Sequence, residues 1–491
     1  MSRRTVAYVT SEIAPFAKTG GLADVSAALP SFLHRAGHDV RVFTPLYSAI
    51  DVDRYDFEPV PAATDVPVKA GGRTLAFSAY RAHLPDTEVP VFFIHCPALY
   101  DRSGLYTSDP DEPLRFALLS RAAIECCQRL GWGPEIFHCH DWQTALVPLY
   151  LKTLYSWDRL FRATRSVLTI HNLGYQGIAP AAVLDDLGLD SCREYLDQED
   201  LKKGRIGLLK TGLLHADWLT TVSPTYAREV RTEAFGFGLH EYLEARRHTF
   251  TGILNGVDTT IWDPRTDPDI PFRYTAKSLW RKKKNKVALL DEVGLPSAGD
   301  PPVLGMITRL VAQKGISLVE EPLTELLAGR DVRLVVLASG ETRYERFFEE
   351  LVRRFPHKAH FHRGFRPELA HRIEAGADMF LMPSLYEPCG LNQMYSLIYG
   401  TVPIVRKTGG LADTVQLADP RDGTGTGIVF EHPTPDGVRW ALEAALALLA
   451  QPAVWRKIVA NGMAVDFSWE REGGLYVELY ERVRAPEKAG V

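Results

Sequence analysis

Two cations follow a predicted strand in the second half of the chain. Val303–Ile307 is a short apolar run that predicts a buried strand, and Arg309 and Lys314 come soon after it. Side chains that follow a parallel strand lie at the carboxyl edge of the sheet, where open α/β sheets bind ligands. A guanidinium grips phosphate oxygens bidentately and an ammonium acts as a compact charge, so the pair could stabilise a departing diphosphate. A solvated turn is the alternative interpretation of such a basic loop.

A carboxylate and a glycine follow another predicted strand, Met379–Met382, in the segment 387–392 (Glu-Pro-Cys-Gly-Leu-Asn). Proline can preorganise the first turn of a helix, and Gly390 lets backbone amides approach a ligand closely. We therefore expect a helix to begin here, with Glu387 beside its positive end, where an ionised carboxylate is favoured. Glu387 could hold sugar hydroxyls. Equally, it could be a helix-start charge, with Cys389 as a buried filler.

Polar residues also end two predicted strands in the first half. Asp141 follows the strand Ile136–His138 closely, and His171 and Asn172 follow the strand Ser166–Ile170. Asp141 and His171 could both face a sugar at the same edge of a sheet. Either could instead be a satisfied buried polar group, so these residues indicate a site mainly in combination.

One heptad occurs twice. Residues 18–24, Lys-Thr-Gly-Gly-Leu-Ala-Asp, recur unchanged as residues 407–413, and each copy follows a predicted strand and opens a predicted helix. Paired glycines allow close backbone approach, and a helix start offers free N–H groups and a positive dipole end. Two such turns would suit a diphosphate held from both halves of the chain. The alternative is a tight turn without ligand, which the identity of the two copies disfavours.

Strands must position all these residues, and short apolar runs alternate with helical-period segments along nearly the whole chain. One series runs from Val6–Val9 to Leu219–Val222, and another from Val303–Ile307 to Val402–Val405. This alternation predicts parallel sheets covered by helices on both faces. Because 491 residues exceed one ordinary core, we expect an α/β fold of two doubly wound domains with the site in the cleft between them.

Turn-forming residues mark the domain boundary near residues 256–272. We expect an N-terminal domain over residues 1–256, a C-terminal domain over 257–469, and a final helix over 470–491. The tail is amphipathic, with Leu475, Leu479 and Val483 on one predicted apolar stripe.

Composition excludes several function classes. With 56 basic and 61 acidic residues the net charge is −5, which gives no general attraction to nucleic acid or to anionic membranes. The dense basic run Arg281–Lys284 is expected to be a solvated helix face. The six cysteines lack Cys-x-x-Cys spacing, which is typical of reduced thiols in the cytoplasm. The His138/His140 pair has no partner pair of matching form, so no metal is expected.

The ordered set of motifs resembles the bacterial and plant glycogen/starch synthases. In chain order, the matching segments are Lys18–Val25, His140–Trp142, His171–Asn172, Asn255–Asp258, Arg309 with Lys314, Glu387–Leu391 and Thr408–Asp413. The resemblance implies two Rossmann-like domains of the GT-B type facing a deep cleft, with the final helix, residues 470–491, returning to the first domain. It also implies transfer of glucose from ADP-glucose to the non-reducing end of an α-1,4-glucan (glycogen or maltooligosaccharide), with retention of configuration and without cofactor or metal.

The resemblance also implies residue roles. Four residues would be catalytic: Arg309, Lys314, Glu387 and His171. Donor-binding residues would be Lys18, Gly21, Phe365, Cys389, Gly390, Leu391, Asn392, Thr408 and Gly410. Asp24, Asp141, Asn172 and Asn255 would contact the sugar or acceptor.

Three positions depart from the family pattern. Asn392 stands where the family usually has Thr, Leu385-Tyr386 where it has Arg-Phe, and Phe365 where it has an adenine-stacking Tyr. The last change keeps a stacking ring but loses its hydroxyl, which weakens the preference for ADP over UDP.

Two alternative functions stay open. A related transferase could use UDP-glucose or a small acceptor, although Tyr395, where many such enzymes carry a second Glu, favours a glycogen synthase. A non-catalytic glucan-binding protein should have lost at least one charged site residue, yet Lys18, Arg309, Lys314 and Glu387 are all present.

Overall fold

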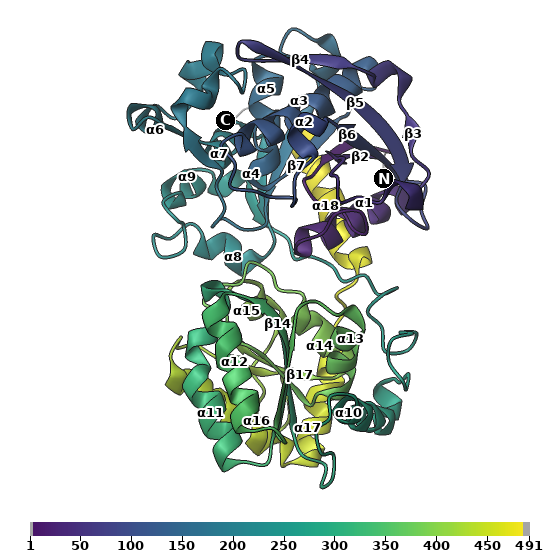
Figure 1. The fold of residues 1–491 in the computed structure, drawn as a ribbon, viewed down its shortest axis with the longest axis vertical. Coiled ribbons are helices and arrows are strands. Elements are labelled where there is room, and N and C mark those ends of the chain that lie inside the picture. The colour runs from purple at the N-terminus through teal and green to yellow at the C-terminus, as the bar shows by residue number, and fades with distance from the viewer. Residues whose placement is uncertain (1–2, 485–491) are drawn as a thin grey trace, which may run out of the picture. The chain divides into compact units, whose positions relative to one another are not determined.

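The computed structural model describes residues 3–484 and divides into two compact units, each with its own sheet (Figure 1). The first unit comprises the chain up to Val222, Ala227–Gly256 and the segment from Trp469 onward. The second comprises Ser223–Tyr226 and Val257–Ser468. Among the described residues, no helix is long and apolar enough to cross a bilayer.

The first unit is built on a sheet whose central strands are parallel. Its spatial order is β12 (Phe250–Gly252), β11 (Trp218–Thr221), β8 (Arg165–Ile170), β7 (Ile136–His140), β1 (Thr5–Val9), β2 (Asp39–Pro45), β6 (Pro90–His95), β5 (Arg73–His83) and β3 (Glu58–Pro59), with β4 (Val66–Ala70) paired to β5. Every neighbouring pair from β12 to β6 is parallel. A small antiparallel pair, β9 (Ile178–Pro180) and β10 (Arg205–Gly207), stands apart.

The expectation of parallel strands throughout is wrong at one edge of this sheet. β5 is antiparallel to β6, to β3 and to β4. Along β5, exposed and buried residues alternate imperfectly. Such a half-solvated pattern is typical of antiparallel strands and lacks the continuous apolar run that marks a buried parallel strand.

Helices cover the first sheet. The helices of this unit are α1 (Gly21–Arg35), α2 (Pro97–Tyr100), α3 (Glu112–Arg129), α4 (Asp141–Thr144), α5 (Val147–Lys152), α6 (Gln198–Lys202), α7 (Leu208–His215), α9 (His240–Ala245) and α18 (Trp469–Arg484). The short helix α8 (Pro224–Glu229) begins in the second unit and ends in the first. The C-terminal helix α18 packs against α1, as the yellow and purple ribbons show (Figure 1). Its Tyr480 hydroxyl bonds to Nδ1 of His138 at 2.8 Å, so α18 belongs to this unit.

The apolar stripe of α18 differs from the predicted one. Leu479 and Val483 are buried as expected, but Leu475 is exposed. Tyr476 and Tyr480 are fully buried instead, and Gly473 lies so close to Phe32 of α1 that a Cβ there would meet its ring at 2.3 Å. The buried face therefore keeps two of the three predicted positions and adds the two tyrosines beside them.

The second unit has an all-parallel sheet. Its order is β15 (Ala359–Arg363), β14 (Arg333–Gly340), β13 (Val303–Leu310), β16 (Met379–Met382), β17 (Val402–Arg406) and β18 (Ile428–Phe430). Its helices are α10 (Trp280–Glu292), α11 (Glu320–Gly329), α12 (Thr342–Arg354), α13 (Pro367–Gly376), α14 (Asn392–Tyr399), α15 (Gly409–Thr414), α16 (Pro435–Leu449) and α17 (Pro452–Met463). Figure 1 shows this sheet edge-on, with α11, α12 and α16 on one face and α13 and α14 on the other.

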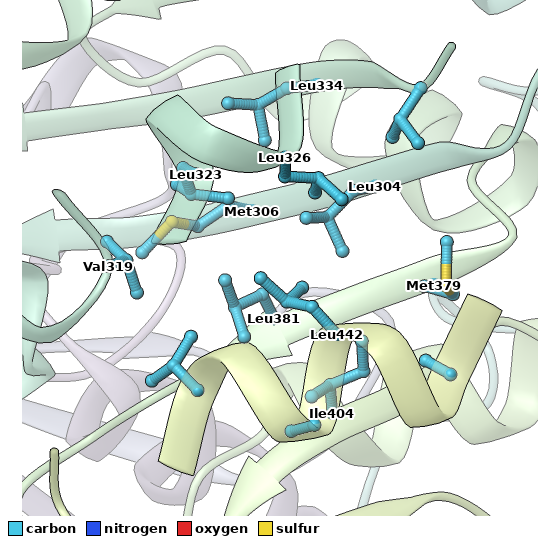
Figure 2. Packing of buried hydrophobic residues seen from close by; sticks show 14 of the residues in the cluster. Leu304, Met306, Val319, Leu323, Leu326, Leu334, Met379, Leu381, Ile404 and Leu442 are labelled. Carbon is cyan, nitrogen blue, oxygen red and sulfur yellow. The ribbon is translucent and has the colours of Figure 1, made fainter. Parts of the chain in front are cut away.

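Branched side chains fill the core of the second unit. Leu304, Leu381 and Ile404 come from three strands and pack with Leu323 of α11 and Leu442 of α16 (Figure 2). Because these strands are buried on both faces, their sequences read as continuous apolar runs. This is why the sequence pattern predicts them well.

The basic run on α10 is only partly solvated, contrary to expectation. Lys282 is buried, and its ammonium donates to the carbonyls of Glu374 and Ala375 and to the Thr401 hydroxyl at 2.6 Å. Burial lowers the pKa of Lys282 to about 7. This lysine ties α10 to α13 and does not belong to a solvated face.

Candidate active site

An ion pair joins two of the predicted catalytic residues in the second unit. Nζ of Lys314 lies 2.6 Å from Oε2 of Glu387, which also accepts a hydrogen bond from the Ser384 hydroxyl at 2.9 Å. The two charged residues follow neighbouring parallel strands, β13 and β16, so their loops meet at the carboxyl edge of the sheet. Gly315 makes the approach possible, because a Cβ there would stand 2.1 Å from the carbonyl oxygen of Pro383.

Arg309 lies at the same edge, but within a strand. β13 extends to Leu310, three residues beyond the predicted end, and Arg309 is an exposed residue near its end. Within residues 3–484 its guanidinium forms no ion pair and no hydrogen bond. The cation is therefore free to meet a ligand, whereas Lys314 already neutralises Glu387.

The loop from Glu387 to Leu391 precedes its helix, and the prediction that Pro388 opens that helix is wrong. α14 begins at Asn392, with Leu391 as the N-cap residue. Gly390 takes the left-handed conformation, φ +74°, next to the side chain of Gln393. Nε2 of Gln393 donates to the carbonyls of Cys389 and Gly390 and so fixes the loop. Glu387 is thus held by Lys314 and Ser384 and does not sit at the helix start.

Asn392 and Cys389, both predicted to bind the donor, have structural contacts. Nδ2 of Asn392 donates to the Ile307 carbonyl of β13 at 2.8 Å, which links the loop to the neighbouring strand. Cys389 is buried. Leu391 and Gly390 are half-buried, so their backbone remains the part of this loop that a ligand can reach.

The second copy of the heptad lies directly against this loop. The amide of Gly410 donates to the carbonyls of Glu387 and Pro388 at 3.1 and 3.2 Å. A Cβ at Gly409 would stand 1.9 Å from the Glu387 carbonyl oxygen. Thr408, the N-cap residue of α15, is fully buried. These glycines therefore provide close packing for the loop that carries Glu387.

Phe365 is the most exposed large apolar residue of the described chain. It lies between β15 and α13, after Gly364 with its φ of +121°, and 75% of its surface is exposed. A planar base could stack on such an exposed ring. The ring therefore suits the stacking role predicted from the sequence.

In the first unit, the structure brings Asp141, His171 and Asn172 together. Oδ1 of Asp141 accepts the amide N–H of His171 at 2.7 Å and that of Asn172 at 3.3 Å. Asp141 opens α4 after β7 and has a left-handed φ of +55°. Aspartate adopts the left-handed conformation more readily than most residues, so Asp141 can make the sharp turn from β7 into α4. Asn172 closes the turn by accepting the amide of Gly174.

Burial shifts the protonation of this cluster. It raises the pKa of Asp141 to about 7, against the lowering effect of the two amide donors, and the charge of Glu12 adds to the rise. Burial also lowers the pKa of His171 to about 3. At neutral pH the imidazole of His171 is therefore uncharged, while Asp141 is poised near its titration point.

Lys18 and Asp24, at the two ends of the first heptad, form a half-exposed ion pair of 2.6 Å. Gly21 is the first residue of α1. Between β1 and the heptad lies a buried carboxylate, Glu12, that belongs to none of the sequence motifs. Glu12 accepts the amides of Thr19 and Gly20 and the hydroxyl of Tyr106. A single Glu just after a strand gave no motif, although its position at the strand's carboxyl end was a usable signal.

Asn255, predicted to contact sugar, is buried next to the end of the first unit. Its Oδ1 has no hydrogen-bond partner among the described residues. The following Gly256 packs on Trp469, where a Cβ would lie 2.7 Å from the indole. Among the described residues, the side chain of Asn255 forms no hydrogen bond to the other predicted residues, so its role stays a prediction.

The structure also assembles three potential metal ligands that the sequence spacing did not suggest. Asp267, Asp269 and His371 have ligand atoms within 4.8 Å of one another. However, Oδ2 of Asp267 already accepts Nδ1 of His371 and the hydroxyl of Tyr399. Asp267 and His371 are thus bonded to each other, as in a structural hydrogen-bond network.

Comparison with known proteins identifies the family. The model of the starch synthase catalytic domain matches residues 5–245, and that of glycosyl transferases group 1 matches residues 291–459. A glycogen synthase from Syntrophotalea carbinolica is 42% identical over 97% of this chain and 98% of its own. One from Koribacter versatilis is 43% identical over 98% and 99%. The chain belongs to the glycogen synthase family.

Solved structures agree with this assignment. The catalytic domain of starch synthase IV from Arabidopsis thaliana, bound to ADP and acarbose, is 36% identical and matches with a TM-score of 0.90 over 99% of this chain and 100% of that one. Sucrose-phosphate synthase from Thermosynechococcus elongatus, at 18% identity and a TM-score of 0.60, shares the fold. This member of the glycogen synthase family is therefore a glucosyltransferase with the GT-B fold, as the motifs predicted.

Proposed function

We propose that this glycogen synthase family member takes glucose from ADP-glucose and adds it to the non-reducing end of an α-1,4-glucan, with retention of configuration and without a metal ion. The related starch synthase that binds ADP and acarbose supports a nucleoside diphosphate and a carbohydrate as ligands. The six buried free thiols support a reducing, cytoplasmic setting.

The observation that carries the proposal is the group of charges at the carboxyl edge of the second sheet. Lys314 and Glu387 form a 2.6 Å pair, and Arg309 has no ion-pair partner in the described chain. On donor binding, Arg309 grips the diphosphate and Lys314 shares its charge between Glu387 and the departing phosphate. Preformed cations of this kind stabilise charge that develops in the transition state without reorganisation. Glu387 accepts hydrogen bonds from the glucose hydroxyls.

Residues of the first unit act on the sugars and on the diphosphate. His171 lies beside the reacting carbon. Asp141, whose carboxylate accepts the backbone amides of His171 and Asn172, contacts donor glucose or acceptor, and so does Asn172. Lys18 exchanges its ion pair with Asp24 for the diphosphate. In the second unit, Phe365 stacks on the base, a contact that any planar base can make.

A donor comparison tests the substrate. Purified protein is given maltooligosaccharide with ADP-glucose or UDP-glucose, and nucleotide release and chain extension are followed, with the anomeric configuration of the product read by NMR. We expect kcat/KM for ADP-glucose to be at least about tenfold higher, the effect of one well-made hydrogen bond. Equal or better use of UDP-glucose contradicts the assignment of ADP-glucose as donor, and a β-linked product contradicts retention of configuration.

A chelator tests the absence of a metal. We expect a strong chelator to leave the rate of transfer unchanged, and a loss of rate on chelation refutes the metal-free mechanism.

Single substitutions test the carrying observation. Arg309→Ala and Lys314→Ala should each lower kcat by roughly 10²- to 10³-fold, the scale of one transition-state electrostatic contact. Glu387→Gln should lower it at least as much. Lys283→Ala is the matched control, because that lysine is exposed on α10 and its ion pair with Asp300, at 3.4 Å, is exposed as well. If Arg309→Ala and Lys283→Ala behave alike, Arg309 does not contact the diphosphate.

A further inference from the structure

His140 contacts the ring of His171 from within the first unit. It is the last residue of β7 and is fully buried, and its Nδ1 lies 3.0 Å from Nε2 of His171. The rings of Tyr8 and His138 pack against it, with centroids 4.1 and 4.3 Å away. The imidazole of His140 is therefore held in one orientation behind that of His171.

One proton must lie between the two imidazoles. Burial lowers the pKa of His171 to about 3 and that of His140 well below its ordinary value, so both rings are neutral at physiological pH. A neutral imidazole carries one N–H and one bare nitrogen. Either His140 donates from Nδ1 to His171, or His171 donates from Nε2 to His140.

The second nitrogen of His140 decides between these states. Nε2 of His140 is enclosed and has no hydrogen-bond partner among the described residues. If His171 were the donor, His140 would carry its own proton on Nε2, as a buried N–H without an acceptor. Such orphaned donors are rare and costly, more so than an unused acceptor. A proton on Nδ1 avoids this cost and makes His140 the donor.

The neighbouring His138 shows what a purely structural histidine looks like here. Its Nδ1 bonds to the Tyr480 hydroxyl at 2.8 Å and its Nε2 to the Thr169 hydroxyl at 2.7 Å. Both of its nitrogens are satisfied within the protein. The ring of His140 differs, because among the described residues its one hydrogen bond is the one to His171.

We propose that His140 is a positioning residue that fixes His171 as the Nδ1–H tautomer. His171 then accepts at Nε2 and has one N–H left, at Nδ1. That atom has no partner in the described chain, and the residue is partly exposed, so its N–H can meet a substrate oxygen. The inference rests on the proposed role of His171 and specifies it: His171 donates a hydrogen bond to the substrate and does not act as a base.

A pair of isosteric variants tests the proposal. His140→Asn and His140→Leu have nearly the same shape, but only Asn offers an N–H near the position of Nδ1, whereas Leu offers neither donor nor charge. We expect kcat of His140→Leu to fall at least about tenfold below that of His140→Asn, as for one lost transition-state hydrogen bond. A residue that only fills space would make the two variants equally active, and that result overturns the proposal.

A measurement on the unaltered protein does not depend on how the variants fold. Histidine labelled with ¹⁵N in the ring distinguishes a protonated from a bare nitrogen by NMR, and the signals of His171 are assigned by their loss in His171→Gln. We expect the proton of His171 on Nδ1 and a bare Nε2. A proton on Nε2 refutes the inference. This measurement is made without any sugar nucleotide. A wrong tautomer is therefore a separate result from a wrong ADP-glucose assignment, which the comparison of ADP-glucose with UDP-glucose tests.

Discussion

The two copies of Lys-Thr-Gly-Gly-Leu-Ala-Asp have the same sequence but different backbones. In the first copy Gly20 precedes α1 with an extended φ of −157°, and a Cβ added there would meet nothing within 4 Å. In the second copy the equivalent Gly409 opens α15 with φ +44°, against the Glu387 carbonyl. Identical residues thus give a strand–turn–helix twice, while the tertiary surroundings choose the conformation at the glycine.

The two turns also bind different groups. The amides of Thr19 and Gly20 donate to the buried carboxylate of Glu12, whereas the amide of Gly410 donates to the loop carbonyls of Glu387 and Pro388. These N–H groups, which the repeat suggested for a diphosphate, are already occupied. The second copy supports a site loop, and the first holds a carboxylate beside a site cluster. Donor contacts of Gly21 and Gly410 stay predictions.

The terminal aspartates of the heptads differ in the same way. Asp24 pairs with Lys18 inside its own copy. Asp413 accepts the hydroxyl of Ser223 and the amide and hydroxyl of Thr225, and so caps α8. A repeated motif therefore predicts local geometry more securely than it predicts contacts.

The largest expected difference concerns the glycines. Gly409→Ala and Gly410→Ala should each lower the free energy of unfolding by about 3 kcal/mol, because the Cβ would lie 1.9 or 2.1 Å from the carbonyl oxygens of Glu387 and Cys389. Gly20→Ala should change it by less than about 0.5 kcal/mol, since its position is open. Thermal unfolding followed by calorimetry measures all three. Equal losses at Gly20 and Gly410 would show that the two turns do not differ.

Glu12 gives the next largest effect. Its carboxylate is 3% exposed and accepts the Thr19 amide and hydroxyl, both at 2.6 Å, besides Gly20 and Tyr106. Glu12→Gln places an NH₂ group against these donors and should cost about 2 kcal/mol of stability. Glu431→Gln, at the exposed partner of Lys407 in the second copy, is the matched control and should be neutral within about 0.5 kcal/mol. Comparable losses in chemical denaturation would mean that Glu12 does not anchor the first turn.

The different outcomes for the two turns show what the sequence could predict. Buried parallel strands such as β1 and β13 are continuous apolar runs, so their positions and the two-domain α/β fold followed from the pattern. Strand pairing did not, which is why the antiparallel β5 was missed. Lys314 and Glu387 could be placed at one sheet edge, but their ion pair across 73 positions and the anchoring of Thr19 by Glu12 depend on tertiary contacts. No local rule encodes those contacts.

The smallest expected effect on stability concerns the two lysines that begin the heptads. Lys18 and Lys407 each form a half-exposed or exposed ion pair of 2.6 Å, with Asp24 and Glu431. Exposed pairs contribute little, so Lys18→Ala and Lys407→Ala should both leave the melting temperature within about 2 °C of the parent.

Activity should nevertheless distinguish the two variants. If Lys18 contacts the donor diphosphate, Lys18→Ala lowers kcat/KM for ADP-glucose by roughly 10- to 100-fold, the value of a charge-assisted hydrogen bond, and Lys407→Ala leaves it unchanged. Lys18→Arg, which keeps the charge on a different geometry, should recover part of the loss. Full activity in Lys18→Ala would reduce the first heptad to a structural turn like the second, because the amides of Thr19 and Gly20 are already bound to Glu12 and the proposal then depends on the ammonium of Lys18 exchanging Asp24 for the diphosphate.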